Sequence, residues 1–462
     1  MGVYSYAQRS AGRFGTLSEV TGLLEAQPAI FPQSPGSLDW LLGPALQQLP
    51  QSEDAFQVAV FAPEGAEDLP VMVFLPGGGF VSGAGTVRWY DAQNFAEKQN
   101  CVVVMVNYRI GLLAHNQQVG GGNLPVEELL LALHWVQRNI SHFGGDPQHT
   151  TLAGQSAGAF WAFVLAQLDE ARGLFQRVYL GSLSYQPPMS QVMADERNAV
   201  IAQALGETSV EQAGTEQLLA AGTAVAKAWA GRGLGLYPSA DRAVPADLFE
   251  VHQAVSRLHV DQVLLSHTAD EASAFIGMAP EQAFSFDAVR GFIAGTFFEP
   301  AGVFEALLAD APEATAKQLM VKAMSLHQIQ LYAAEFADES ADHGIQVQLL
   351  GFEVRSPLPN AGSAHCFELP FLFDNRGAWH DAPMLHGFSE ETFSAVAAEL
   401  SGAVGSFVRS GTAASTGGTA LPLHTSGAQS MTALGESGLA THAIDRRFTA
   451  KRQVLASLSP KS

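Results

Sequence analysis

The sequence has few cysteines, few positive charges and no long hydrophobic run. Its two cysteines, Cys101 and Cys366, are too few for a disulfide framework, and its first residues, MGVYSYAQRS, lack the apolar core of a signal peptide. We therefore expect a cytoplasmic protein. The longest apolar runs, such as VVVMV at 102–106, are far shorter than the roughly 18 residues of a membrane helix, so no membrane association is expected.

The shortage of positive charge bears on possible partners. Lys and Arg number 24 against 45 Asp and Glu, which gives a formal net charge of −21. A diffuse negative field repels the phosphate backbone and anionic lipids, so nucleic acid is not expected as a partner. Charged residues make up 15% of the 462 residues and hydrophobic residues 47%, a composition typical of a globular protein with a large core.

Apolar segments of strand length alternate with helical segments along the chain. LPVMVFLPGGGF at 69–80 and NCVVVMVNYR at 100–109 predict two buried parallel strands. The apolar spacing within 125–140 predicts a helix. Further strands are expected in TTLAG, RVYLG, QVLLS and IQVQLLGFEV, and a further helix in AGAFWAFVLAQL. This alternation predicts an α/β fold with a mostly parallel central sheet and helices on both faces.

No internal repeat, heptad array or linker interrupts this pattern. We therefore expect one elaborated domain over residues 1–462. Two alanine-rich stretches of helical character, at about 190–235 and 280–340, are expected to be helical insertions that cover the sheet edge over the active site.

A glycine-rich segment, GQSAG at 154–158, contains a candidate nucleophile, Ser156. A catalytic serine exposes its Oγ on a tight turn between strand and helix, where the flanking residues must be small. Gly154 and Gly158 meet that requirement, and the N–H of Ala157 lies at a helix start, where the dipole favours negative charge. The preceding strand and the following apolar helix favour a nucleophile over a plain turn.

The segment LPGGGF at 75–80 is the second motif. Three glycines after a strand allow backbone N–H groups to point into a cavity, so we expect Gly78 and Gly79 to form an oxyanion hole together with Ala157. The alternative is a flexible loop or a phosphate-binding loop, but the GK[ST] ending of a phosphate-binding loop is absent.

These motifs resemble, in their order, those of type B carboxylesterases, the family of cholinesterases and bacterial para-nitrobenzyl esterases. The matching segments are SEDAFQVAVFAP, GGGFVSG, VVVMVNYRIG, LALHWVQRNISHFGGDP and GQSAG, and they cover much of the chain. The resemblance implies the α/β-hydrolase fold and a serine esterase that needs no cofactor.

The acid and the base of a catalytic triad are expected after Ser156, each on a loop that follows a strand. In DQVLLSHTADEASAF both Asp270 and Glu271 follow an apolar strand. The segment resembles the family's DEGxxF, which implies Glu271 as the acid and leaves Asp270 as the alternative. AGSAHCFELPFLFD resembles the family's HxxELxFxF, which implies His365 as the base. A metal role for His365 is disfavoured, because no zinc-ligand spacing accompanies it.

Four further residues are assigned by the same resemblance. Phe80 and Phe275 match pocket-lining positions, although an aromatic residue in such a loop is as often part of the core. Gln155 stands where the family usually has Glu. Its neutral amide argues against choline esters as substrates, and the alternative is a simple hydrogen-bonding replacement of the carboxylate. Ser182 is expected to contact Glu271.

The resemblance also implies that Arg109 forms a structural ion pair with Asp146.

Taken together, these residues predict a serine carboxylesterase that hydrolyses small to medium apolar carboxylic esters through an acyl-enzyme intermediate. The alternatives are an amidase, carbamate or lactone hydrolase with the same triad, and a cholinesterase-like binding protein that has lost catalysis. The sequence leaves the physiological ester and the oligomeric state open.

Overall fold

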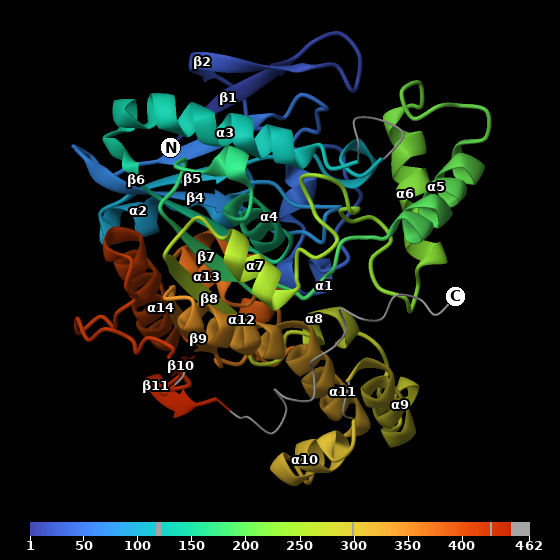
Figure 1. Cartoon of the computed structure of the whole chain (residues 1–462), viewed down its shortest axis with the longest axis vertical. Helices are drawn as coiled ribbons and strands as arrows, with labels where there is room; N and C mark the ends of the chain where they lie inside the picture. The colour runs from blue at the N-terminus through green and yellow to red at the C-terminus, as the bar shows by residue number, and fades with distance from the viewer. Residues whose placement is uncertain (117–121, 298–299, 426, 445–462) are drawn as a thin grey trace.

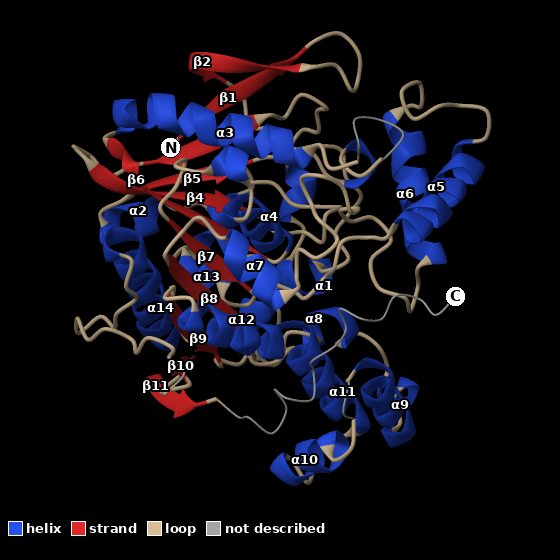
Figure 2. Ribbon diagram, viewed as in Figure 1, coloured by secondary structure: helices blue, strands red, loops and turns tan. Residues whose placement is uncertain are grey.

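A computed structural model describes residues 1–116, 122–297, 300–425 and 427–444 of the chain. The strands are β1 (Gly2–Arg9), β2 (Leu17–Glu25), β3 (Gln57–Phe61), β4 (Leu69–Leu75), β5 (Val102–Val106), β6 (Gly145–Gln155), β7 (Arg177–Gly181), β8 (Gln262–Thr268), β9 (Gln346–Phe352), β10 (Ser430–Gly435) and β11 (Gly438–Ala443). They form an 11-stranded sheet in the order β11-β10-β9-β8-β7-β6-β4-β5-β3-β1-β2 (Figures 1 and 2).

The centre of this sheet is parallel, as the alternation of strands and helices predicts. The strands from β10 to β5 in that order pair in parallel, whereas β11, β3, β1 and β2 pair antiparallel to their neighbours. The sequence analysis did not predict these antiparallel edge strands.

Helices cover both faces of the sheet (Figure 2). They are α1 (Asp39–Leu42), α2 (Gln93–Gln99), α3 (Pro125–Asn139), α4 (Ala157–Ala166), α5 (Gln191–Leu205), α6 (Thr215–Ala228), α7 (Val251–Arg257), α8 (Ser273–Ile276), α9 (Phe286–Thr296), α10 (Val303–Asp310), α11 (Ala316–Ser325), α12 (Leu331–Asp342), α13 (Leu369–Leu372) and α14 (Glu390–Ser410). None of the helices formed by the described residues has the length and apolar character needed to cross a bilayer.

Strands β4 and β5 are apolar at every position because both faces of the sheet are buried there. On β4, Val71 and Val73 join a core together with α3, α4 and α12, whereas Met72 and Phe74 join a core on the opposite face with α2, α13 and α14. Helix α4 is buried along its whole length, which explains why its sequence carries no charge. The predicted α/β-hydrolase architecture, a mostly parallel sheet between helical layers, is confirmed.

The two predicted helical stretches occupy different places. Helices α5 and α6 pack against each other and contribute to the same core as α3 and α4. Helices α9, α10 and α11 share a separate apolar cluster, whereas α12 packs on the sheet (Figure 1). Residues 298–299 of the second stretch lie outside the described residues. The single-domain organisation stays a prediction.

The buried ion pair of Arg109 differs from the one that the resemblance implies. The Arg109 side chain pairs with Glu128 on α3, and its backbone N–H donates to Glu128 Oε2 at 2.7 Å. Asp146 instead accepts a hydrogen bond from the N–H of Gln148 at 2.9 Å. The predicted pair with Asp146 is therefore wrong, because α3 brings a closer carboxylate to the guanidinium.

We expect Glu128→Ala to lower the free energy of unfolding by about 3–5 kcal/mol, since it leaves the buried Arg109 charge uncompensated. Asp146→Ala is the matched control and should cost only about 1 kcal/mol, the contribution of an ordinary hydrogen bond. Urea unfolding of both variants measures the difference. Equal destabilisation of the two variants would contradict this assignment.

Candidate active site

Ser156 lies on the tight turn between β6 and α4. Its φ of 56° and ψ of −123° are unusual for a residue other than glycine, and its N–H donates to the carbonyl of Gly181 at 2.9 Å. A Cβ on Gly158 would lie 1.9 Å from the carbonyl oxygen of Leu75, and one on Gly154 would lie 2.4 Å from the carbonyl carbon of Gly158. Glycine is required at both flanking positions because two backbone segments touch there.

The glycine loop after β4 lies against this turn. A Cβ on Gly77 would be 3.0 Å from the Cβ of Ser156, whereas a Cβ on Gly79 would meet no atom within 4 Å. Gly78 and Gly79 both have positive φ, of 137° and 59°. Within the described residues, the N–H groups of Gly78, Gly79 and Ala157 donate no hydrogen bond to another part of the chain. Three backbone donors therefore remain available beside Ser156.

Glu271 is buried at the end of β8, and its carboxylate has three partners. Its Oε2 lies 2.5 Å from His365 Nδ1. Its Oε1 accepts hydrogen bonds from the Ser182 hydroxyl at 2.6 Å and from the Thr268 N–H at 2.8 Å. The expected contact between Ser182 and Glu271 is thus present. The N–H of Thr268 is a partner that the sequence analysis missed, because a backbone donor carries no sequence signal.

The adjacent Asp270 points to different partners. Its Oδ2 lies 3.0 Å from Arg355 and accepts a hydrogen bond from the Ser363 N–H at 3.1 Å, and its Oδ1 lies 3.2 Å from Lys322. The Asp270 carboxylate therefore pairs with Arg355 and Lys322 and binds the loop backbone at Ser363. Glu271 is the carboxylate beside His365.

His365 lies on the loop after β9, and its Nε2 faces the side chain of Gln155. The amide nitrogen of Gln155 is 3.4 Å from His365 Nε2 and 3.4 Å from Cys366 Sγ. Among the described residues, no hydrogen bond joins the Ser156 hydroxyl to the imidazole. In unliganded sites such bonds are often loose and tighten when substrate binds. The structure therefore brings the predicted acid, Glu271, and the predicted base, His365, together, while Ser156 makes no hydrogen bond to the imidazole within the part of the chain that the structure describes.

The pair formed by Glu271 and His365 favours the charged forms of both groups. Burial alone raises the pKa of Glu271, but His365, Ser182 and the N–H of Thr268 outweigh it and lower this pKa. Burial lowers the pKa of His365, whereas Cys366 and Glu271 raise it to well above its usual range. An imidazolium formed at this position is therefore stabilised.

Glu368 is a neighbour that the sequence analysis did not single out. It is 3% exposed, and neither carboxylate oxygen makes a hydrogen bond of good geometry within the described residues, although the Gln155 amide and the charge of His365 oppose the rise of its pKa. Burial, followed by the charge of Glu271, raises the pKa of Glu368 to about 7. Its place in HCFEL, three residues after His365, is a sequence signal, but its isolation from water becomes evident only in the folded chain.

The two predicted pocket aromatics lie in different surroundings. Phe80 is 4% exposed and packs edge-on against Phe160 and Trp161, so its ring belongs to the core. Phe275 is 56% exposed, and its ring centroid lies 5.3 Å from that of His365. Only Phe275 therefore presents an exposed apolar surface beside the imidazole.

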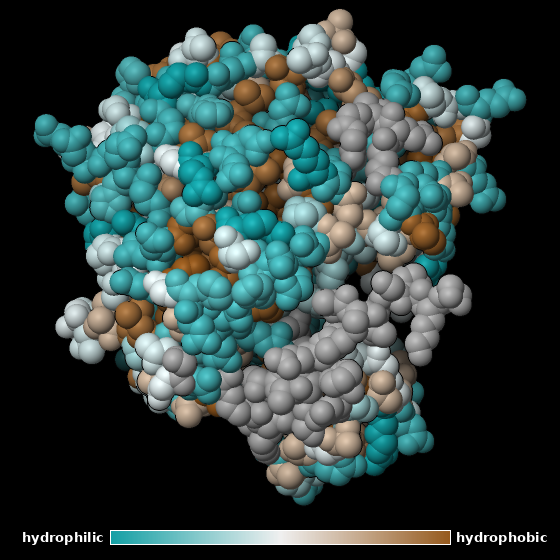
Figure 3. Space-filling model, viewed as in Figure 1, coloured by the Kyte–Doolittle hydropathy of each residue, from teal (hydrophilic) through white to brown (hydrophobic). Residues whose placement is uncertain are grey.

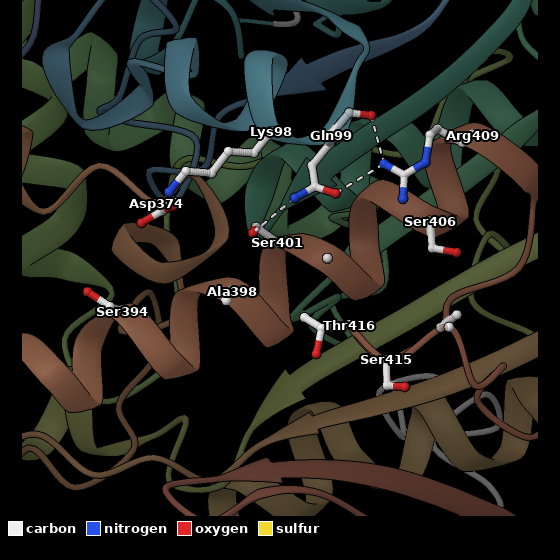
Figure 4. A pocket seen from close by; sticks show the side chains of 13 residues that line it. Lys98, Gln99, Asp374, Ser394, Ala398, Ser401, Ser406, Arg409, Ser415 and Thr416 are labelled. Atoms are coloured by element: carbon white, nitrogen blue, oxygen red, sulfur yellow. Dashed lines mark hydrogen bonds and ion pairs between the residues drawn. The ribbon is translucent and has the colours of Figure 1, made fainter.

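A polar hollow of about 480 Å³ lies between α2, α14 and the loop at 414–418 (Figure 4). Its two cations already have partners, because Lys98 pairs with Asp374 and Arg409 donates to both oxygens of Gln99. None of the predicted catalytic or oxyanion-hole residues lines it. This hollow is distinct from the surroundings of Ser156.

Comparisons of the sequence and of the structure with known proteins point to the same family. The model of the carboxylesterase family matches residues 30–229. The chain is 33% identical to a probable N-octanoylanthranilate hydrolase of Rhodococcus erythropolis, over 83% of this chain and 82% of that protein, and 29% identical to a phenmedipham hydrolase of Pseudarthrobacter oxydans, over 78% and 75%. The carboxylesterase EST55 of Geobacillus stearothermophilus aligns with a TM-score of 0.80 at 25% identity, over 97% of this chain and 95% of the other.

These similarities extend over most of the chain and agree with the architecture and the serine turn described above. The chain belongs to the carboxylesterase family and is a hydrolase of ester bonds with the α/β-hydrolase fold.

Proposed function

We propose that this enzyme hydrolyses small to medium apolar carboxylic esters through an acyl-enzyme formed on Ser156, with His365 as general base and Glu271 as its acid partner. The contact of 2.5 Å between Glu271 Oε2 and His365 Nδ1 carries the proposal. In the neutral imidazole it keeps the proton on Nδ1, so that Nε2 is the nitrogen that accepts the Ser156 proton. The strained turn at Ser156 adds support.

The proposed reaction begins with transfer of the Ser156 proton to His365 Nε2 as Oγ attacks the ester carbonyl. The carbonyl oxygen becomes an oxyanion, which receives hydrogen bonds from the N–H groups of Gly78, Gly79 and Ala157. The tetrahedral intermediate then collapses, and His365 gives its proton to the departing alcohol. Water repeats the sequence on the acyl-enzyme and releases the carboxylic acid.

The step that brings His365 Nε2 to Ser156 involves Gln155. The neighbour of His365 Nε2 is the Gln155 amide nitrogen, at 3.4 Å, so the proposed proton transfer requires Nε2 to turn from this amide to the Ser156 hydroxyl. The neutral amide places no formal charge beside the imidazole, which supports neutral esters over choline esters as substrates.

An exposed apolar side chain beside the imidazole supports an apolar substrate. Phe275 is 56% exposed, and its ring lies next to that of His365. An apolar acyl or alcohol group that covers this side chain would gain about 25 cal/mol for each Å² removed from water. Phe80 lies in the core, so any effect it has on substrate is through packing.

Amide hydrolysis is the second candidate. The observation that favours it is the relative named as a probable N-octanoylanthranilate hydrolase, because N-acyl cleavage can use the same nucleophile and oxyanion donors.

We also keep a cytoplasmic location and a small-molecule substrate as parts of this proposal. Both cysteines are free and buried.

We expect Ser156→Ala to abolish hydrolysis of a short-chain p-nitrophenyl ester, leaving at most about 10⁻³ of wild-type kcat, because the variant lacks the proposed nucleophile. An organophosphate should label Ser156 of the wild type, as located by mass spectrometry. A folded wild-type protein with neither turnover nor labelling would instead be the non-catalytic binding protein.

We expect Glu271→Gln to lower kcat by about 10³–10⁴-fold, because the amide no longer stabilises the imidazolium or fixes its tautomer. The matched control is Asp270→Asn, which changes the adjacent carboxylate and should lower kcat far less. Circular dichroism verifies the fold of both variants. The reverse order of the two effects would assign the acid to Asp270.

We expect Glu368→Gln to change how stability depends on pH. The raised pKa means that the folded wild type holds a proton that the unfolded chain releases above pH 4.5, so wild-type stability declines between about pH 4.5 and about pH 7 and levels off above that. The variant lacks this proton, so its stability relative to wild type should rise over that range by up to about 3 kcal/mol. Urea unfolding at pH 5, 6, 7 and 8 measures this, and parallel curves would refute it.

A further inference from the structure

Three side chains with metal-ligating atoms meet on the surface where α7 packs against α12. His252 lies on α7, Glu339 near the end of α12, and His343 directly after it. One ligand atom from each lies within 4.8 Å of the others. Neither the proposed hydrolysis nor the carboxylesterase family assignment gives these residues a role.

The carboxylate lies between the two imidazoles. Glu339 Oε1 is 2.7 Å from His252 Nδ1 and 3.5 Å from His343 Nδ1. The two ring centroids are 5.4 Å apart, and the ring planes are inclined by 62°. The three side chains therefore converge and need only rotamer changes to share one ion.

Local backbone geometry maintains this arrangement. Glu339 and His343 are four residues apart, which places them on one face of a helix. His343 Nδ1 is also 2.9 Å from the Glu339 carbonyl oxygen, an interaction that would leave Nε2 free for a ligand. Helix α7 then supplies His252 from a segment 87 residues earlier than Glu339. Two helices that pack together thus provide all three ligands.

The site is open to solvent and negatively charged. The side chains of His252, His343 and Glu339 are 62%, 36% and 29% exposed, and the face over α7 and α12 is largely hydrophilic (Figure 3). Glu250, the N-cap residue of α7, adds a second carboxylate to this surface beside that of Glu339. Two carboxylates at a solvent-exposed site favour the approach of a cation.

We propose that His252, Glu339 and His343 bind one divalent transition-metal ion of the zinc class. Two imidazoles and one carboxylate form a borderline-soft donor set that suits Zn²⁺ and that alkaline-earth ions do not favour. Water completes a four-coordinate shell. When the ion binds, it replaces the proton of the hydrogen bond between His252 and Glu339, and that proton is released to solvent.

The proposed ion would stabilise the fold without entering the reaction. It would link α7 to α12, and α12 continues directly from a π-helical turn, Leu326–Gln330. From this turn the Gln330 amide donates to the carbonyls of Thr268 and Ala269, at 3.1 and 3.3 Å, just before the proposed acid Glu271. Because the folded chain alone assembles the three ligands, the metal should raise the melting temperature.

The test is Zn²⁺ titration of the metal-stripped full chain by isothermal calorimetry. We expect one Zn²⁺ per chain, and at least about a tenfold loss of affinity in His252→Ala and in His343→Ala. The matched control is His380→Ala, which removes an exposed histidine from another surface and should bind Zn²⁺ like the wild type. Co²⁺ bound to the wild type should show the absorption of a tetrahedral site.

A second readout is the melting temperature with and without Zn²⁺. It should rise on Zn²⁺ addition in the wild type and in His380→Ala but stay unchanged in the His252→Ala/His343→Ala double variant. Absence of stoichiometric binding by the wild type would overturn the proposal. So would binding that the double variant retains, since that ion would occupy another place on the chain.

Discussion

The site depends first on one close approach between backbones, that of Gly158 to the end of β4. A Cβ there would lie 1.9 Å from the carbonyl of Leu75, so the contact forms only with glycine. Through it the first turn of α4 lies against the chain just before the glycine loop, with Gly77 beside Ser156. One packing constraint thus positions the proposed nucleophile together with the backbone donors for its oxyanion.

A second constraint on the site is electrostatic, because a buried carboxylate needs partners that compensate its charge. Glu271 and Asp270 are adjacent, yet Glu271 is enclosed beside His365 while Asp270 meets Arg355 and Lys322. A carboxylate removed from water is tolerated only when partners compensate its charge, and here the partner of Glu271 is the imidazole that the proposed reaction needs. For Glu368 the compensation by His365 and Gln155 is weaker than the cost of burial, so its pKa is raised to about 7.

Helix α12 connects these features to the rest of the molecule. Its buried face belongs to the sheet core, while its end provides Glu339 and is followed by His343 at the surface. The turn before it contacts the backbone that precedes Glu271. A helical stretch that the sequence analysis assigned wholly to an insertion therefore supports the sheet.

The sequence by itself determined the central strands, helix α3 and the turn at Ser156, because periodicity and the need for small residues are local properties. Family motifs added Glu271 and His365. Only the tertiary structure decided which carboxylate reaches Arg109, that Gln155 faces His365, and how the edge strands pair. Each of these outcomes depends on distances between segments far apart in the chain, which packing sets and which no local pattern encodes.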